Sequence, residues 1–84
     1  MAKSIHTDEY QQFIKLLRKY REDARITQDR LADELGVSQA VISKIESCER
    51  RLDIIELRQI CEFLDVSLVT FVKNLDNVLR NGHS

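Results

Sequence analysis

The side chains with the clearest potential for chemistry lie in residues 28–47, where polar groups recur at helical spacing. On a helix that starts at residue 39, one face carries Gln39, Ala40, Ser43, Lys44 and Ser47. This face combines an amide, hydroxyls and an ammonium group, which form hydrogen bonds. It contains no acid, although 14 of the 84 residues are Asp or Glu. An ordinary solvated face of this chain would be expected to carry some acids, so the pattern indicates a contact surface.

Two short helices joined by a sharp turn would hold this face in place. Thr27 can cap a helix that starts at Gln28, and Gly36 can end it because glycine adopts a positive φ without steric cost. The side chain of Val37 is expected to anchor the turn by packing into the core, and Ser38 is expected to cap the second helix. The inward positions are Leu31, Ala32, Leu35, Ile42 and Ile45. This pattern predicts a DNA-binding helix-turn-helix motif, with a plain helical hairpin as the alternative.

Hydrophobic spacing predicts three further helices, which run over 8–22, from about 54, and over about 68–79. Thr7 is expected to cap the first of them, and Asp53 and Glu56 to form a capping box at the second. Their inward positions include Tyr10, Phe13, Ile14, Leu17, Leu57, Ile60, Cys61 and Leu64. The stretch LGVS at 35–38 is echoed by LDVS at 64–67, which we interpret as one tight reversal used twice. We therefore expect an all-α fold of five helices, with residues 1–84 forming one domain whose core spans about 8–79.

The composition argues against several classes of protein. No apolar run reaches the ~20 residues that span a bilayer, and residues 1–10 lack the apolar core of a signal peptide, so we expect a cytoplasmic protein with no membrane partner. Cys48 and Cys61 have no metal-ligand spacing, so no metal site is expected. Cys61 is expected to be buried, whereas Cys48 could be an exposed reactive thiol. No catalytic constellation or phosphate loop is present, so we expect neither an enzyme nor a cofactor or small-molecule ligand.

The net charge of −1 is low for a protein that binds nucleic acid, but the charges are unevenly distributed. Basic residues concentrate in 15–25 and 44–51, whereas acids dominate the second and fourth predicted helices. Those acids can face away from a duplex and limit non-specific attraction. We expect a moderate affinity for DNA that depends steeply on salt.

From Arg21 to Phe71 the chain resembles the Cro and phage-repressor type of helix-turn-helix protein, also called XRE-like. The pattern shared with that family reads R-x5-TQ-x2-LA-x2-LGVSQ-x2-IS-x2-E and lies within about 50 of the 84 residues. The resemblance implies a compact, five-helix, lambda-repressor-like domain. It also implies binding to operator DNA as a dimer, with the third helix in the major groove.

The resemblance also implies roles for individual residues. The base-reading positions are Gln39, Ala40, Ser43 and Lys44, where Gln39 suits adenine, Lys44 guanine and Ala40 a thymine methyl. Gln28 is expected to hold a phosphate and to brace Gln39. Arg21 and Glu46 match an ion pair that ties the first helix to the third and leaves the guanidinium near a phosphate. The positions expected to contact the DNA backbone further on are Ser47, Arg50 and Arg51, with a solvated basic loop as the alternative for the two arginines.

Two residues depart from the family pattern, because Arg25 and Cys48 stand where glycine is frequent. A left-handed conformation at Cys48 would cost ~1 to 2 kcal/mol, unless the third helix ends differently. The path of the backbone at these two corners is therefore open, whereas the base-reading face is unaffected.

The predicted last helix carries more apolar positions than a compact core should need. They are Leu68, Val72, Leu75, Val78 and Leu79. Such a patch favours a homodimer interface, which would place two recognition helices about 34 Å apart. An ordinary core helix with a frayed end is the alternative.

The sequence therefore predicts a DNA-binding transcription regulator, acting as a dimeric repressor on an inverted-repeat operator. A stand-alone regulator, a restriction-modification controller and the antitoxin of a toxin-antitoxin pair share this pattern. A protein-interaction module that keeps the fold without specific DNA binding is the alternative from another class. The near-neutral charge favours that alternative, and the Gln28 and Gln39 pair opposes it.

Overall fold

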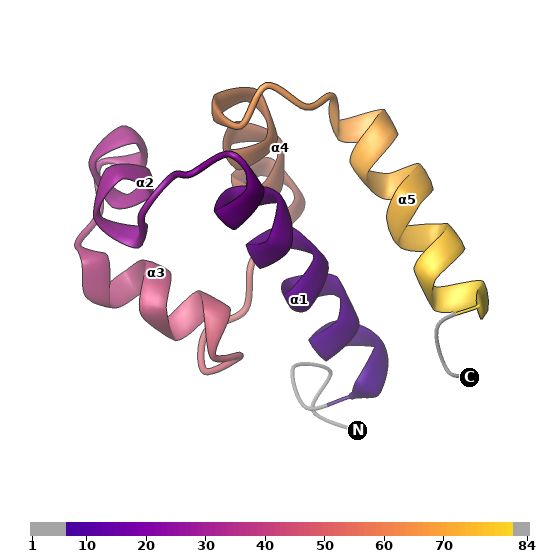
Figure 1. Ribbon diagram of the computed structural model, residues 1–84. Coiled ribbons are helices and arrows are strands. Elements are labelled where there is room, and N and C mark those ends of the chain that lie inside the picture. Colours follow the sequence, from indigo (N-terminus) through magenta and orange to yellow (C-terminus); the bar gives the residue numbers. More distant parts are fainter. Residues whose placement is uncertain (1–6, 82–84) are drawn as a thin grey trace.

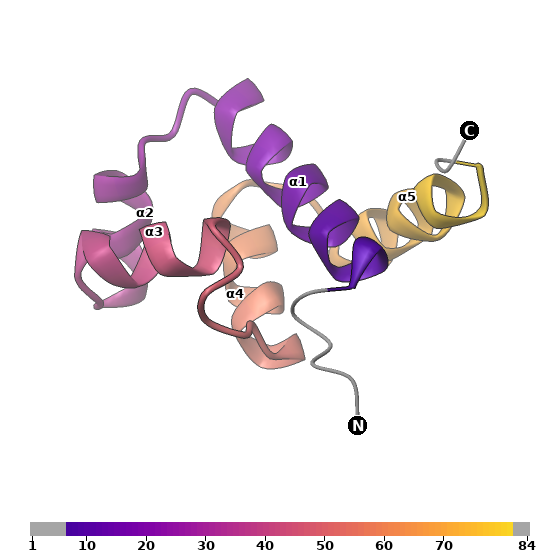
Figure 2. The same cartoon turned by 90° about the horizontal axis from the view of Figure 1, so that it is seen from below.

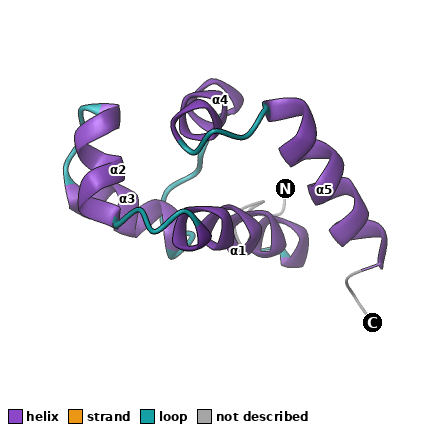
Figure 3. Ribbon diagram, turned by 45° about the horizontal axis from the view of Figure 1, so that its top comes forward, coloured by secondary structure: helices purple, strands orange, loops and turns teal. Residues whose placement is uncertain are grey.

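The computed structural model describes residues 7–81, which form five α-helices and, within that range, no strand (Figure 1, Figure 3). The helices are α1 (Asp8–Asp23), α2 (Gln28–Leu35), α3 (Gln39–Glu46), α4 (Ile54–Phe63) and α5 (Leu68–Asn81). The predicted all-α class and all five predicted helices are confirmed. Within the described residues, no helix is long and apolar enough to cross a bilayer.

The helices are arranged around α1 and α4, which lie in the middle of the molecule. The α2–α3 pair packs at one end, where α2 contacts α4 and α3 contacts α1, and α5 packs against α1 and α4 at the other end. Figure 2 shows this separation, with α3 and α5 on opposite sides of α1. The outer surfaces of α3 and α5 are therefore independent of each other.

Hydrogen bonds accepted by short polar side chains start four of the helices, and at α5 the Ser67 hydroxyl accepts from the Thr70 N–H at 3.0 Å. The Thr7 hydroxyl accepts from the Tyr10 N–H, and the Thr27 hydroxyl accepts from the Arg30 N–H. Asp53 and Glu56 form the expected capping box at the start of α4. Ser38 is the N-cap residue of α3, but the prediction that its side chain caps the helix is wrong, because this side chain makes no capping hydrogen bond within the described structure.

The corners between the helices use left-handed backbone, which L side chains other than glycine rarely adopt. Gly36 has a φ of 70° after α2, and three other residues take the same conformation: Arg25 (61°), Cys48 (64°) and Asp65 (60°). Arg25 and Cys48 therefore adopt the left-handed conformation that glycine takes without steric cost. Asp65 matches Gly36, so the echo between 35–38 and 64–67 reflects the same reversal.

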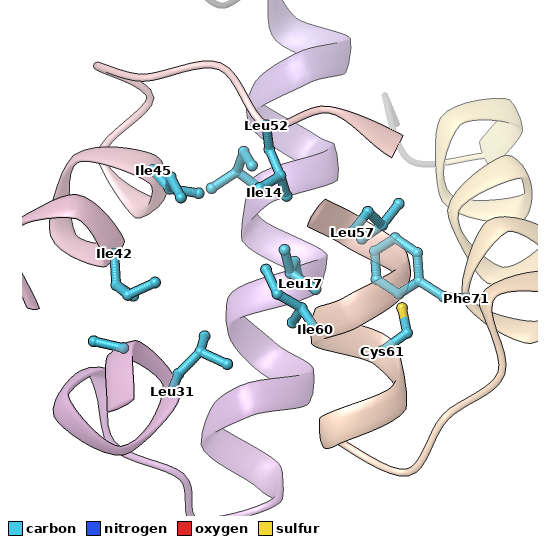
Figure 4. Close-up of a cluster of buried hydrophobic side chains, with 11 residues drawn as sticks. Ile14, Leu17, Leu31, Ile42, Ile45, Leu52, Leu57, Ile60, Cys61 and Phe71 are labelled. Carbon is cyan, nitrogen blue, oxygen red and sulfur yellow. The ribbon is translucent and has the colours of Figure 1, made fainter. Parts of the chain in front are cut away.

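The hydrophobic core is shared by all five helices and by Leu52, which precedes α4. Figure 4 shows most of its members, which are Ile14, Leu17, Leu31, Ala32, Ile42, Ile45, Leu52, Leu57, Ile60, Cys61 and Phe71. The expected burial of Cys61 is confirmed, whereas Leu64 is only half-buried. The expectation for Val37 is wrong, because its side chain is 38% exposed. The turn at Gly36 leaves Val37 at the surface, where it borders a small hollow beside Leu35 and Val41.

Candidate nucleic-acid interface

The outer face of α3 carries the predicted base-reading residues. Ile42 and Ile45 anchor the opposite face in the core, and this packing fixes the rotation of the helix about its axis. Gln39, Ala40, Ser43 and Lys44 are then all exposed. The structure therefore brings an amide, a methyl group, a hydroxyl and an ammonium group together on one accessible helix face.

A buried ion pair joins α1 to the end of α3, as the resemblance implied. The Arg21 Nε donates to Glu46 Oε2 at 2.6 Å, and Nη2 donates to Glu46 Oε1 at 2.9 Å. The two side chains are only 8% and 7% exposed. Nη1 donates to the Ile26 carbonyl oxygen at 2.6 Å, so each guanidinium nitrogen has a partner inside the protein. This geometry gives Arg21 a structural role and leaves its expected contact with a phosphate without support.

Gln28 connects this ion pair to the first residue of α3. Its Nε2 donates to Glu46 Oε1 at 2.9 Å, and its Oε1 accepts from Gln39 Nε2 at 2.6 Å. Gln28 is half-buried at the start of α2, whereas Gln39 is exposed. The brace between the two glutamines is therefore present, and it continues inward to the buried carboxylate.

Residues 47–53 form an ordered loop between α3 and α4. The Ser47 hydroxyl donates to Glu49 Oε2 at 2.6 Å, and the Leu52 N–H donates to the Tyr10 hydroxyl on α1 at 2.9 Å. The contact with Tyr10 joins residues 42 positions apart, so no local sequence signal could reveal it. Burial raises the pKa of Tyr10, so this hydroxyl remains neutral at physiological pH.

The two arginines of this loop differ in their surroundings. Arg50 donates from Nη2 to Glu56 Oε2 at 2.8 Å and from Nη1 to Glu56 Oε1 at 3.3 Å. This pairing lowers the pKa of Glu56 and raises that of Arg50. Arg51 is exposed at the surface. Glu56 therefore serves both the capping box and the ion pair, of which its sequence pattern predicts only the capping box.

The two cysteines are free thiols in different environments. Burial raises the pKa of Cys48 and of Cys61, which favours the neutral thiol over the reactive thiolate. This direction opposes the hypothesis of a reactive Cys48. Within residues 7–81, no three His, Cys, Asp or Glu side chains gather as a metal site would require.

The apolar positions predicted for dimerisation do not form one free stripe on α5. Leu68 and Leu75 pack against the core, and Val78 and Leu79 are half-buried, whereas Val72 is 43% exposed. Exposed apolar residues outside that prediction include Ile54 and Ile55 at the start of α4. A shallow groove joins Val72 to Ile54, and its lining also includes Phe13, Leu52, Leu57 and Leu75.

A five-helix fold that exposes an acid-free outer face of its third helix, held by a tight turn and a buried ion pair, defines a small helix-turn-helix DNA-binding protein. A family model described as helix-turn-helix matches residues 17–71. The chain belongs to the XRE-type helix-turn-helix family of DNA-binding transcription regulators.

Two solved structures are similar over most of this chain. One is an XRE-family like protein from Pseudomonas syringae pv. tomato str. DC3000, with 37% sequence identity and a TM-score of 0.80 over 89% of this chain and 92% of that one. The other is a mutant of the restriction-modification controller protein C.Esp1396I, with 29% identity and a TM-score of 0.80 over 89% of this chain and 100% of that one. A comparison with curated proteins gives no match.

Proposed function

We propose that this protein is a sequence-specific transcription regulator that places α3 in the major groove of operator DNA. The observation that supports this most strongly is the pair Gln28 and Gln39, in which a half-buried amide holds an exposed amide at the first position of α3. A held side chain loses less conformational entropy on binding than a free one. Gln39 would read adenine, Lys44 guanine, and Ala40 a thymine methyl, with Ser43 as a further donor or acceptor.

The DNA backbone would be contacted by groups on either side of α3. Gln28 keeps a second Nε2 proton, beyond the one given to Glu46, that could reach a phosphate. Ser47 and Arg51 are exposed beyond the end of α3. Arg50 would bind a phosphate less strongly than Arg51, because its guanidinium already pairs with Glu56. Such contacts fix the position of the protein without reading sequence.

A homodimer would form through the groove between α1, α4 and α5, with Val72 and Ile54 as the exposed anchors. Ile54 follows the end of α3 by eight residues. Contact at this groove would therefore place the segment that follows α3 close to the two-fold axis. Contact through the far end of α5 would separate the copies of α3 more widely, because α5 lies on the opposite side of α1 from α3 (Figure 2). This proposal keeps Val72 and Leu75 of the predicted interface and moves its centre toward α4.

As a dimer on an inverted repeat, the protein would act as a repressor by occupying a promoter, which requires DNA binding alone. Residues 1–84 would form one helix-turn-helix domain located in the cytoplasm. Similarity to a restriction-modification controller protein favours a second candidate, in which the regulated promoter belongs to a restriction-modification system.

Selection of bound duplexes from a random DNA library, at about 100 mM salt, tests the proposed function. Enrichment of an inverted repeat with half-site centres about one helical turn apart is the expected result. A folded protein that enriches no sequence would contradict it and favour an interaction module that keeps the fold. Enrichment of single, unpaired half-sites would support reading by α3 and contradict the dimer.

A further inference from the structure

The buried carboxylate of Glu46 lies at the inner end of a hydrogen-bond chain that reaches the exposed face of α3. Arg21 donates to both of its oxygens, and Gln28 Nε2 donates to Oε1. Gln28 Oε1 in turn accepts from Gln39 Nε2. The chain therefore runs from a side chain that is 7% exposed to the first residue of the recognition helix.

The chemistry of a carboxylate gives this chain a single direction. An ionised carboxylate accepts hydrogen bonds and donates none. The end of the Gln28 amide that faces Glu46 must therefore be its NH2 group, and its oxygen must face Gln39. Gln39 then turns its own NH2 group toward Gln28. Reversing either amide would bring two acceptors or two donors together and lose at least one hydrogen bond.

We propose that Glu46 is a positioning residue that fixes, through Gln28, which end of the Gln39 amide meets which atom of a base. This inference rests on the proposed function, in which Gln39 reads a base edge. Gln39 retains its oxygen and the second proton of Nε2 for a partner. Adenine presents an N6 donor beside an N7 acceptor, so the order of oxygen and nitrogen on the amide decides whether both bonds can form.

A purely structural role for Glu46 makes a different prediction. Loosening the contact between α1 and α3 would lower stability and weaken binding to every DNA sequence. Loss of the polarity set by Glu46 would instead reduce the preference at one base pair and leave the other base preferences unchanged. The two roles are therefore separated by base preference at a single position.

The test compares two variants that both disturb the ion pair. Glu46→Gln keeps the shape but replaces an acceptor-only group by an amide that can also donate. Arg21→Lys weakens the same contact but keeps the carboxylate. Both are used in duplex selection beside the wild type and Gln39→Ala, which identifies the base pair that Gln39 reads. Binding is compared at equal concentrations of folded protein.

Glu46→Gln is expected to reduce the preference at that base pair by roughly fivefold or more, the lower end of what a bidentate contact provides. Arg21→Lys is expected to retain it. Unchanged preference in Glu46→Gln, or an equal loss in Arg21→Lys, would overturn the inference while the proposed function stands. A wild type that enriches no sequence would overturn both.

If Glu46→Gln does not fold, nuclear magnetic resonance of the wild type tests the orientation of the Gln28 amide on which the inference depends. The Gln28 side-chain amide protons should show Overhauser contacts to the Arg21 guanidinium protons, because both groups donate to Glu46 Oε1. A Gln28 amide whose protons show no contact with the Arg21 guanidinium protons would overturn the inference.

Discussion

Removing the carboxylate of Glu46 is expected to destabilise the fold strongly. In Glu46→Leu, the Arg21 guanidinium remains buried and loses two of its three hydrogen bonds, keeping the bond to the Ile26 carbonyl and a 4.0 Å contact with the exposed carboxylate of Glu22. Removal of one partner of a buried ion pair costs about 3 to 5 kcal/mol. The total stability of a chain of 84 residues is roughly 4 to 13 kcal/mol, so the loss is a large fraction of the whole.

Unfolding in urea, followed by far-ultraviolet circular dichroism, measures this loss. The double variant Arg21→Met with Glu46→Leu is the matched control, because it removes the uncompensated charge and fills the site with apolar groups. It should be more stable than Glu46→Leu alone, although the Ile26 carbonyl loses its donor. A loss below about 1 kcal/mol in Glu46→Leu, or a double variant no more stable than the single one, would refute this account of the ion pair.

Four further outcomes are expected. Gln39→Ala should cost ~1 to 3 kcal/mol of binding free energy on the selected operator and little on random DNA. Arg51→Ala should weaken binding to both kinds of DNA alike. Equal losses on both for Gln39→Ala in binding titrations would exclude base reading. Ile54→Lys should shift the protein toward monomer in analytical ultracentrifugation, because it would bury a charge at the shared groove. The control Val69→Lys, at a 77% exposed position outside the lining of the groove, should not. Equal effects of the two substitutions would contradict this interface. The pKa of Glu56 in the folded protein lies below its ordinary value of 4.5, so the stability that Glu56 contributes is present above pH 4.5 and is lost as the pH falls through the folded-state pKa. The loss should be below about 1 kcal/mol, because the ion pair with Arg50 is partly exposed. Glu56→Gln should remove this pH dependence from the free energy of unfolding. Cys48 should react with iodoacetamide at pH 7 more slowly than a free cysteine, since its pKa is raised, and faster reaction would restore the redox hypothesis.

The sequence was sufficient to predict the helices and their caps because those depend on neighbouring residues. Thr27, Gly36 and the Asp53 and Glu56 pair act within four positions of the groups they satisfy. Val37 is not buried as predicted, because a valine in a tight turn has the same local pattern whether or not another element covers it. The side-chain hydrogen bond expected at Ser38 also failed, because the rotamer of a hydroxyl depends on more than its position before a helix.

The contacts that complete the candidate site lie beyond what local patterns can predict. The brace between Gln28 and Gln39 and the Arg21 ion pair came from the family resemblance, whereas the bond from Gln28 to Glu46 requires the packed arrangement of α1, α2 and α3. The groove at Ile54 was also missed, since helical periodicity places Leu68 and Leu75 on an apolar stripe without showing that the core already covers part of them.

The loop between α3 and α4 has one conformation that the protein's own side chains hold. Hydrogen bonds from Ser47 to Glu49 and from the Leu52 N–H to Tyr10 hold it, together with the pairing of Arg50 with Glu56. Coupled folding and binding buries surface from the newly ordered segment and makes the heat-capacity change on binding strongly negative. Here that contribution should be missing, so calorimetry should give a heat-capacity change that the contact surface alone accounts for. Association should be correspondingly fast, since docking need not await a rearrangement of this loop.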